Sequence, residues 1–283
     1  MIYFQELGSS GRLGNQLFQY AALRGLCLKK NYETAIPDLN SKLWQGQRCL
    51  LTEFNIVGRQ YSNESILFNY IEPTWREFDP KFFNINDNTN IRGYFQNLYY
   101  FEEFEDNIKR ELTPKKKYIE KNIKFIEDIK KIYGCEIVSV HLRRGDNMTA
   151  SNSHLYKNMF NVDEVYFRYF NKAKEVFNGK NVKFLIFTGG NRGDENNLSD
   201  MDWCKQTFIG DEYLFSENQK PINDFTRIML CDHNIISHIS SFGWWAAYLN
   251  KNPDKIVVAP KYYHPEDKTL IRDKFYPNKY ILL

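Results

Sequence analysis

Two adjacent arginines, Arg143 and Arg144, follow a predicted buried strand within the segment His-Leu-Arg-Arg-Gly-Asp at 141–146. Guanidinium groups bind phosphate oxygens in pairs and keep their charge at physiological pH. Ligands of open α/β sheets bind at the carboxyl ends of the strands, which is where these arginines lie. The pattern therefore indicates a clamp for a diphosphate. The alternative is a surface salt bridge between arginine and Asp146, worth about 0–1 kcal/mol when exposed.

A glycine-rich turn, Gly-Arg-Leu-Gly-Asn-Gln at 11–16, precedes the first predicted helix. Gly11 and Gly14 allow backbone amides to approach a ligand, and the N-terminus of the following helix favours negative charge. The turn does not match G-x-G-x-x-G, and no acidic residue follows at the expected distance, which disfavours an oxidoreductase. The alternative is a packing turn that binds no ligand.

Two serines, Ser240 and Ser241, precede another predicted helix. A serine in this place can cap the helix or donate a hydrogen bond to a phosphate. Asp224 lies one predicted helix earlier, and its carboxylate can accept hydrogen bonds from the N1 and N2 donors of guanine. The two tryptophans at 244–245 are expected in the core.

The elements that would position these residues form two series of strands and helices. Continuous apolar strands are typical of a parallel sheet that is covered on both faces. Residues 113–117 form the clearest break in composition, whereas residues 31–90 give no readable pattern. The sequence predicts an α/β fold with domains at 1–115 and 116–283. The expected strands lie at 2–7, 91–93, 136–142, 182–187, 234–237 and 255–259, and the expected helices at 15–30, 94–112, 118–132, 162–177, 224–231 and 242–249.

Composition excludes several functions. Lys plus Arg exceeds Asp plus Glu by 38 minus 35, a net charge of +3 without a long basic run, which argues against a nucleic-acid partner. No window approaches the ~18 apolar residues of a membrane span, so we expect no integral membrane segment and leave peripheral membrane association open. The five cysteines form no C-x-x-C pair, which favours reduced thiols and a cytoplasmic protein.

Three segments in this order carry a resemblance: 11–21, 141–146, and 233–236 with 240–247. Arg-Gly-Tyr-Phe-Gln at 92–96 and Ala-Pro-Lys at 259–261 fit the same pattern. Together they closely resemble the α1,2-fucosyltransferases of glycosyltransferase family 11, in a bacterial-type soluble form. The resemblance spans nearly the whole chain.

The resemblance implies a GT-B-like fold, in which two Rossmann-like domains face each other across a cleft. The N-terminal domain would lie on the acceptor side and the C-terminal domain would bind GDP-fucose. The enzyme would move L-fucose with inversion to a galactose-containing glycan, at O2 of a terminal galactoside. No metal and no cofactor are implied.

Site residues follow from the same resemblance. Arg143 would bind the β-phosphate, and Asp146 would be either the catalytic base or a group that orients the arginines. The remaining residues would bind substrate: His141 and Arg144 at the nucleotide, Gly14 and Asn15 near the diphosphate, Ser240, Ser241 and Phe242 on the phosphate side, and Asp224 at the guanine.

The sequence departs from the family pattern after the strand at 182–187. Gly189 and Gly190 stand where the family commonly has an acidic pair, and Asp194 or Glu195 are candidate substitutes. The departure leaves open a non-catalytic nucleotide- or glycan-binding relative, and transfer of another GDP-sugar or to another hydroxyl remains an alternative. The Asp-Met-Asp at 200–202 matches the pattern of metal-dependent glycosyltransferases, but we interpret it as a polar lead-in to a helix at Trp203.

Overall fold

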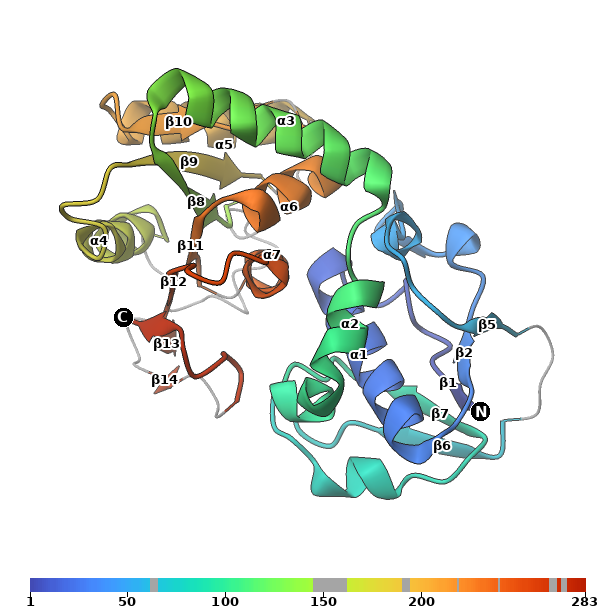
Figure 1. Ribbon diagram of the computed structural model, residues 1–283. Coiled ribbons are helices and arrows are strands. Elements are labelled where there is room, and N and C mark those ends of the chain that lie inside the picture. The colour runs from blue at the N-terminus through green and yellow to red at the C-terminus, as the bar shows by residue number, and fades with distance from the viewer. Residues whose placement is uncertain are drawn as a thin grey trace. The chain divides into compact units, whose positions relative to one another are not determined.

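The computed structural model describes residues 1–61, 66–144, 162–189, 194–217, 219–238, 240–264, 269–270 and 274–283. The chain divides into two compact units (Figure 1). Unit 1 comprises Met1–Lys115 and Arg272–Asn278, and unit 2 comprises Lys116–Ile271 and Lys279–Leu283. Unit 2 therefore does not include residues 272–278, which lie within the predicted domain at 116–283. The reason is packing, because Phe275 stacks on Phe18 with ring centroids 6.1 Å apart.

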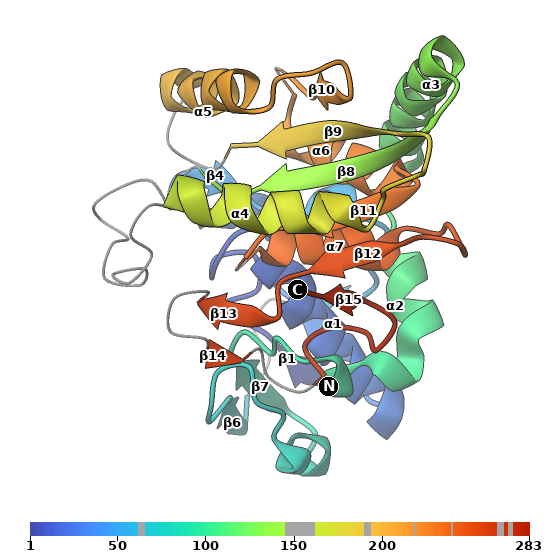
Figure 2. The same cartoon turned by 90° about the vertical axis from the view of Figure 1, so that its left-hand side faces the viewer.

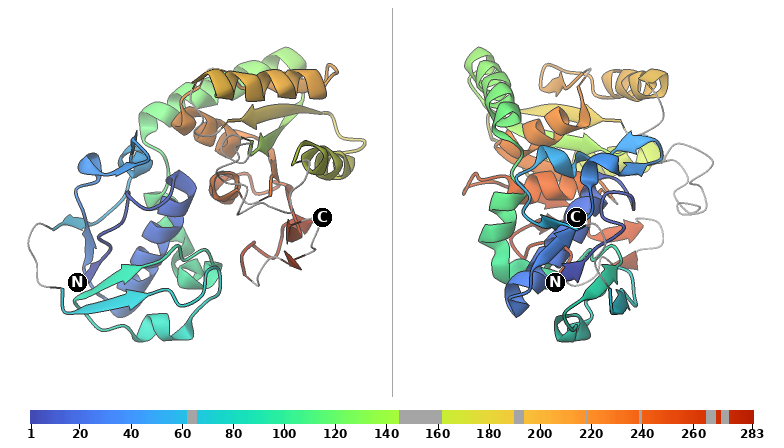
Figure 3. Two further views of the ribbon diagram at one scale, coloured as in Figure 1. Left: turned by 180° about the vertical axis from the view of Figure 1, so that it is seen from behind. Right: turned by 90° about the vertical axis from the view of Figure 1, so that its right-hand side faces the viewer.

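Unit 1 contains a parallel sheet. In the described part of the chain it has five strands in the order β5-β2-β1-β7-β6. The central strands β1 and β7 are direct neighbours, so the loops that follow them lie at the same edge of the sheet. Figure 3 shows this sheet from behind, with α1 in blue. The bounds are β1 Ile2–Tyr3, β2 Thr34–Ile36, β5 Arg59–Gln60, β6 Phe68–Ile71 and β7 Thr89–Arg92.

Helix α1, Leu13–Lys30, confirms the helix predicted at 15–30 and begins two residues earlier. Its apolar side chains are buried along most of its length, as the helical spacing of Leu17, Phe18 and Ala21 predicts. The preceding strand is shorter than the predicted 2–7, because the Leu7 N–H already donates to the Phe4 carbonyl in a turn.

The remaining elements of unit 1 are short, which explains why residues 31–90 gave no pattern. Strand β5 is exposed at both residues, and an edge strand of this kind carries no alternation of apolar and polar side chains. The helix predicted at 94–112 divides into two 3-10 turns and a short α-helix. The bounds are β3 Leu43–Trp44, β4 Gln47–Arg48, η1 Leu39–Ser41, η2 Leu50–Glu53, η3 Pro80–Asn84, η4 Leu98–Tyr100, η5 Glu102–Phe104 and α2 Glu105–Glu111.

Unit 2 contains a second parallel sheet, with six strands among the described residues in the order β10-β9-β8-β11-β12-β15. Strand β8 has the predicted bounds, and most other predicted elements of this unit are confirmed within three residues. The bounds are α3 Lys116–Tyr133, β8 Glu136–Leu142, α4 Val162–Glu175, β9 Val182–Thr188, α5 Asp194–Thr207, β10 Tyr213–Phe215, α6 Pro221–Leu230, β11 His233–Ile236, α7 Ser241–Leu249, β12 Val257–Ala259, β13 Tyr262–His264, β14 Thr269–Leu270 and β15 Ile281–Leu282.

Helices cover both faces of the second sheet. One face buries apolar side chains of α4, of α5 and of the residues that directly follow these helices. Among them are Phe170 of α4, Phe177 after α4 and Phe208 after α5. Helix α6 packs against α3 and α7; α3 and α6 also pack against β8, and α7 packs against β11. Figure 2 shows α4 in front of the sheet with α6 and α7 behind it. Trp244 and Trp245 of α7 are fully buried, which confirms their predicted place in the core.

The strand order of unit 2 reverses between β8 and β11. Strands β9 and β10 continue the sheet on one side of β8, and β12 and β15 continue it on the other side of β11. In open α/β sheets, a crevice for ligands forms at the carboxyl ends of the two strands where the order reverses. The segments that begin at Arg143 and Ser237 leave the sheet at this point.

The described cysteines are free, and Cys27, Cys49, Cys204 and Cys231 are buried. Burial raises the pKa of the Cys27 and Cys49 thiols to about 11, so both remain protonated and unreactive. Among the described residues, no helix is long and apolar enough to cross a membrane.

We expect Gly25→Ala to destabilise the protein although alanine is the better helix former by about 1 kcal/mol. A Cβ at Gly25 would lie 2.1 Å from the carbonyl oxygen of Tyr100, so η4 or α1 would have to move. Urea denaturation should show a net loss of at least ~1 kcal/mol, in the range of overpacked cores. Lys30→Ala, at an exposed position of the same helix, should stay within about 0.5 kcal/mol, and a stabilised Gly25→Ala would contradict the close packing.

Candidate active site

His141 stands at the end of β8 and contacts the start of α7. Its Nδ1 lies 3.0 Å from the Ser240 Oγ, and the same hydroxyl accepts a hydrogen bond from the Gly243 N–H at 3.1 Å as the N-cap of α7. The ring of Phe242 lies 5.3 Å from the imidazole. Burial, with the nearby charge of Arg143, lowers the pKa of His141 to about 3. His141 is therefore a neutral residue that holds the helix start against the strand.

Arg143 follows at the point where the strand order reverses. Its backbone N–H donates to the Ser237 Oγ at 3.2 Å, which ties the loop after β8 to the loop after β11. Its side chain is half-buried, as are Ser241 and Phe242 at the first positions of α7. A helix N-terminus carries partial positive charge, and Arg143 adds a full one. The structure thus brings Arg143, His141, Ser240, Ser241 and Phe242 to one cationic edge of unit 2.

Arg144 takes a different path from its neighbour. It is 6% exposed, its Nε lies 3.2 Å from the Asp200 Oδ1, and its guanidinium covers the Trp203 ring at 3.9 Å. Arg144 thus forms a buried ion pair with Asp200 of α5, which differs from the exposed salt bridge considered as the alternative. Asp200 lies inside α5, so the interpretation of Asp-Met-Asp at 200–202 as a lead-in to the helix is wrong. The helix begins earlier, and Asp200 is placed in its middle to balance Arg144.

Asp224 lies in the first turn of α6, next to the end of β10. Its Oδ1 accepts a hydrogen bond from Ser216 at 2.7 Å, and the Ser216 Oγ accepts one from Arg227 at 2.9 Å. Burial raises the pKa of Asp224 from 3.8 to about 7, although Ser216 and Arg227 act in the opposite direction. The neighbouring Phe225 packs edge-to-face on Phe242 at 5.3 Å, which connects this carboxylate to the start of α7.

Two further side chains hold Arg227 in place. The Arg227 Nε donates to the Asn122 Oδ1 at 3.0 Å, and the Arg227 guanidinium covers the Phe125 ring at 3.5 Å. Both partners belong to α3. Contacts from α3 and α6 therefore fix the position of the Ser216 hydroxyl, which directly follows β10. The sequence predicts a binding role for Asp224 but none for Ser216 or Arg227, because nothing in the spacing marks these two residues.

In unit 1, the glycine-rich turn is held by three glutamines. The Gln16 Nε2 donates to the Gly11 carbonyl at 2.8 Å, and the Gln19 Nε2 donates to the Gly93 carbonyl at 3.2 Å. The Gln96 Nε2 donates to the Asn15 Oδ1 at 2.8 Å. The loop after β1 is thereby tied to the segment after β7. Gly14 is buried in the first turn of α1, whereas Asn15 is half-exposed.

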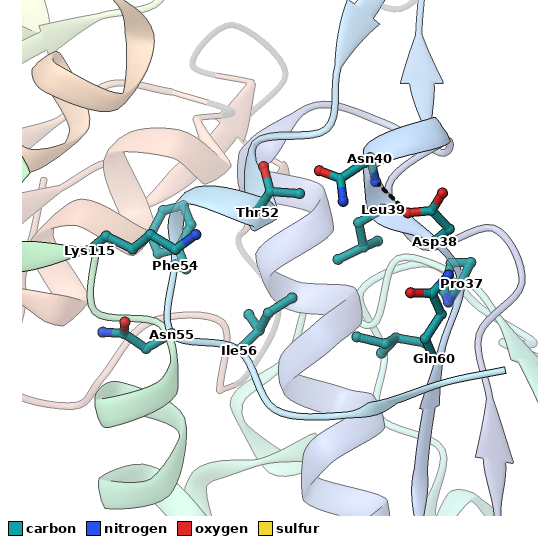
Figure 4. Close-up of a pocket in the computed structure, with 11 residues that line it drawn as sticks. Pro37, Asp38, Leu39, Asn40, Thr52, Phe54, Asn55, Ile56, Gln60 and Lys115 are labelled. Carbon is teal, nitrogen blue, oxygen red and sulfur yellow. Dashed lines mark hydrogen bonds between the residues drawn. The ribbon is translucent and has the colours of Figure 1, made fainter.

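A cavity of about 500 Å³ lies elsewhere in unit 1, beyond the carboxyl end of β2 (Figure 4). None of the predicted site residues lines it. Its polar groups are mainly uncharged amides and a hydroxyl, which suit a polyhydroxylated ligand better than a phosphate. The lining residues are Ile36, Pro37, Asp38, Leu39, Asn40, Thr52, Phe54, Asn55, Ile56, Gln60 and Lys115.

Some predicted residues lie outside the described part of the chain. These are Asp146 and Gly190, and the side chains of Asp194 and Glu195 are likewise not described. Gly189 directly follows Thr188, whose hydroxyl donates to the Leu142 carbonyl at 3.0 Å. Among the described residues, no group of three or more His, Cys, Asp or Glu side chains could hold a metal ion.

Comparison with known proteins identifies the class. The family model for glycosyl transferase family 11 matches residues 4–281. An alpha-1,2-colitosyltransferase from Escherichia coli is 28% identical, over 89% of this chain and 89% of its own length. Galactoside alpha-(1,2)-fucosyltransferase 2 from Sus scrofa is 24% identical, over 86% of this chain and 68% of its own length.

Two solved structures share the fold at low sequence identity. NodZ alpha-1,6-fucosyltransferase soaked with GDP-fucose aligns with a TM-score of 0.50 and 15% identity, over 84% of this chain and 89% of that one. The apo form of POFUT1 aligns with a TM-score of 0.50 and 10% identity, over 91% of this chain and 97% of that one. The α/β class with parallel sheets is thus confirmed, and the chain is a glycosyltransferase. It belongs to glycosyl transferase family 11, as the resemblance predicted.

The buried ion pair between Arg144 and Asp200 predicts that replacing Asp200 will destabilise the protein much more than replacing Asp202. Asp200→Ala should lower the free energy of unfolding by about 3–5 kcal/mol, because it leaves the Arg144 charge buried without its carboxylate. Asp202→Ala, at an exposed position of the same helix, should change stability by about 0.5 kcal/mol or less. Chemical denaturation measures both, and equal effects would show that Arg144 does not depend on Asp200.

Proposed function

We propose that the protein transfers L-fucose from GDP-fucose, with inversion, to O2 of a terminal galactoside. The observation that carries the proposal is the cationic edge at the reversal of strand order in unit 2. There the Arg143 N–H is bonded to Ser237, and His141 contacts Ser240 at the start of α7. Membership of family 11 and the alpha-(1,2)-fucosyltransferase among the relatives support the same reaction.

The chemistry of the donor explains why such an edge is needed. GDP-fucose carries β-linked fucose, and an α-linked product requires a single displacement at C1. As the bond between C1 and the phosphate oxygen breaks, the sugar becomes cationic and negative charge collects on the β-phosphate. Preorganised donors aimed at that charge stabilise the transition state. Arg143 and the amides at the start of α7 would supply them, with Ser240, Ser241 and Phe242 on the phosphate side.

Neutral His141 would not act as an acid or base in this scheme. Its pKa of about 3 keeps it uncharged, and its contact with Ser240 fixes the helix start at which the phosphate would bind. The acceptor hydroxyl must lose its proton late in the reaction. We propose Asp146 for that role or for orienting Arg143, and no metal is part of the scheme.

Asp224 would recognise the base. An ionised carboxylate can accept hydrogen bonds from both N1–H and N2–H of guanine, and Ser216 fixes its orientation from the other side. Arg144, held by Asp200, would support the nucleotide through the position of its neighbour Arg143. Unit 1 would provide the acceptor side of a GT-B-like arrangement, and its residues Gly14 and Asn15 would contact the donor near the diphosphate. Its amide-lined cavity is a candidate place for a sugar of the acceptor.

A second candidate reaction is colitosyl transfer, which the colitosyltransferase among the relatives favours. The deciding experiment offers the purified protein radiolabelled GDP-fucose or nucleotide-activated colitose with a panel of galactosides, with and without EDTA. We expect an α1,2-linked fucosyl product, identified by NMR, that forms equally in EDTA. Transfer of colitose alone would establish the second candidate, and GDP-fucose binding without transfer would indicate a non-catalytic relative.

Replacement of Arg143 should lower the catalytic activity without lowering the stability of the fold. Arg143→Ala should lower kcat/KM by about 100-fold or more, the usual effect of deleting one donor to a transition-state anion. Arg143→Lys should not restore activity, because lysine keeps the charge but loses the planar fork. Melting temperatures should stay close to that of the wild type. Arg168→Ala, at an exposed arginine of α4, serves as the control, and an active, folded Arg143→Ala would refute the mechanism.

Binding of GDP-fucose should depend on the ionisation of Asp224. In the free protein its pKa is raised to about 7, so below that pH guanine would meet a protonated carboxyl and the affinity should fall. Well below this pKa, the affinity for GDP-fucose should fall about tenfold for each pH unit, because one proton must leave Asp224 before binding. Titration calorimetry between pH 5.5 and 8.5 measures this, and GDP-fucose avoids the terminal phosphate of GDP, which titrates nearby. Asp224→Asn should bind weakly without pH dependence, and an unchanged slope in this variant would exclude Asp224.

A further inference from the structure

A chain of three side chains in unit 1 connects the glycine-rich turn to a buried arginine. The Arg76 Nε donates to the Gln96 Oε1 at 2.9 Å, and the Gln96 Nε2 donates to the Asn15 Oδ1 at 2.8 Å. Arg76 and Gln96 are 9% and 3% exposed, whereas Asn15 is half-exposed. The chain therefore runs from the interior of the unit to its surface.

The chemistry of arginine fixes the direction of every hydrogen bond in this chain. Amide oxygen and nitrogen can exchange places by a flip, so the orientation of a glutamine or asparagine depends on its partners. A guanidinium has only donors, so the atom of Gln96 that faces Arg76 must be the oxygen. The Gln96 amide nitrogen then faces Asn15, and the atom of Asn15 that receives it must also be an oxygen.

The Asn15 amide consequently has one orientation. Its Oδ1 is committed to Gln96, and its Nδ2 lies on the other side, above Gly11, where a Cβ would come within 2.6 Å of that nitrogen. In this orientation the NH₂ group of Asn15, rather than its carbonyl, faces the glycine-rich turn. An NH₂ group donates to phosphate or hydroxyl oxygens and repels none of them.

The backbone of Arg76 adopts an unfavourable conformation at the position from which its side chain reaches Gln96. Its φ is +66°, a left-handed conformation that costs a non-glycine residue about 1–3 kcal/mol. Its guanidinium lies over the rings of Trp75 at 4.2 Å and Phe275 at 5.1 Å. Backbone strain of this kind persists only where the surrounding contacts determine the conformation, and it is concentrated at functional sites.

We infer that Gln96, with Arg76 behind it, is a positioning residue that locks the Asn15 amide as a hydrogen-bond donor to an oxygen of the bound substrate. The inference rests on the proposed function, in which Asn15 contacts the donor near the diphosphate. It adds Gln96 and Arg76 to that site although neither contacts the substrate.

The test is a double-mutant cycle on kcat and KM for GDP-fucose. Gln96→Glu keeps an acceptor for Arg76 and removes the donor to Asn15, so Asn15 must turn its NH₂ inward. We expect kcat/KM to fall about tenfold or more, the value of one hydrogen bond to a charged group. In an Asn15→Ala background, the same substitution should change kcat/KM less than about twofold, because contacting residues that act as one unit are not additive. A full loss in that background would show a charge effect and overturn the inference.

Two further measurements separate this inference from its premises. The melting temperature of Gln96→Glu should not fall, because Arg76 gains a charged partner, and neutral Gln96→Met should reproduce the loss of kcat/KM. The side-chain ¹⁵N–¹H signals of Asn15, assigned by their absence in Asn15→Ala, should shift in Gln96→Glu whether or not the protein turns over GDP-fucose. Unshifted signals would refute the locked amide, while an inactive wild type would refute only the proposed function.

Discussion

The close approach of α7 to the end of β8 is the constraint on which the site in unit 2 depends. A Cβ at Gly243 would lie 2.9 Å from the His141 Nδ1, so the helix can start there only because residue 243 has no side chain. That approach lets Ser240 cap the helix and touch His141 with one hydroxyl. The imidazole is buried and its pKa falls to about 3, so His141 adds no positive charge to that of Arg143 and of the helix start.

The two adjacent arginines show how one motif divides between two tasks. Both follow β8 directly, in a tight turn in which the Arg144 N–H donates to the Leu142 carbonyl at 3.0 Å, and their side chains have different surroundings. Arg144 is directed to α5, where Asp200 and Trp203 bind it. Arg143 stays half-exposed at the reversal of strand order. The buried pair fixes the backbone from which Arg143 extends, and the proposed phosphate site would need such preorganisation.

Both units use the same principle, in which a buried charged residue orients a less buried polar group of the candidate site. In unit 1, Arg76 acts through Gln96 on Asn15. In unit 2, Arg227 acts through Ser216 on Asp224. In each case the guanidinium has only hydrogen-bond donors. It therefore dictates the direction of the hydrogen bonds that lead from the arginine to Asn15 or to Asp224. In the proposed function, Asn15 would donate to the diphosphate and Asp224 would accept from guanine.

The sequence by itself determined the α/β class, the strand at 136–142, the helix at 15–30, the buried tryptophans and the family, because long periodic segments and motif spacing are local properties. It could not resolve residues 31–90, where strands of two to four residues are held by neighbours far along the chain. Only the tertiary structure decided that Arg144 pairs with Asp200 and that Gln96 orients Asn15. Those partners lie 56 and 81 residues away in sequence, and no local pattern encodes a contact at that separation.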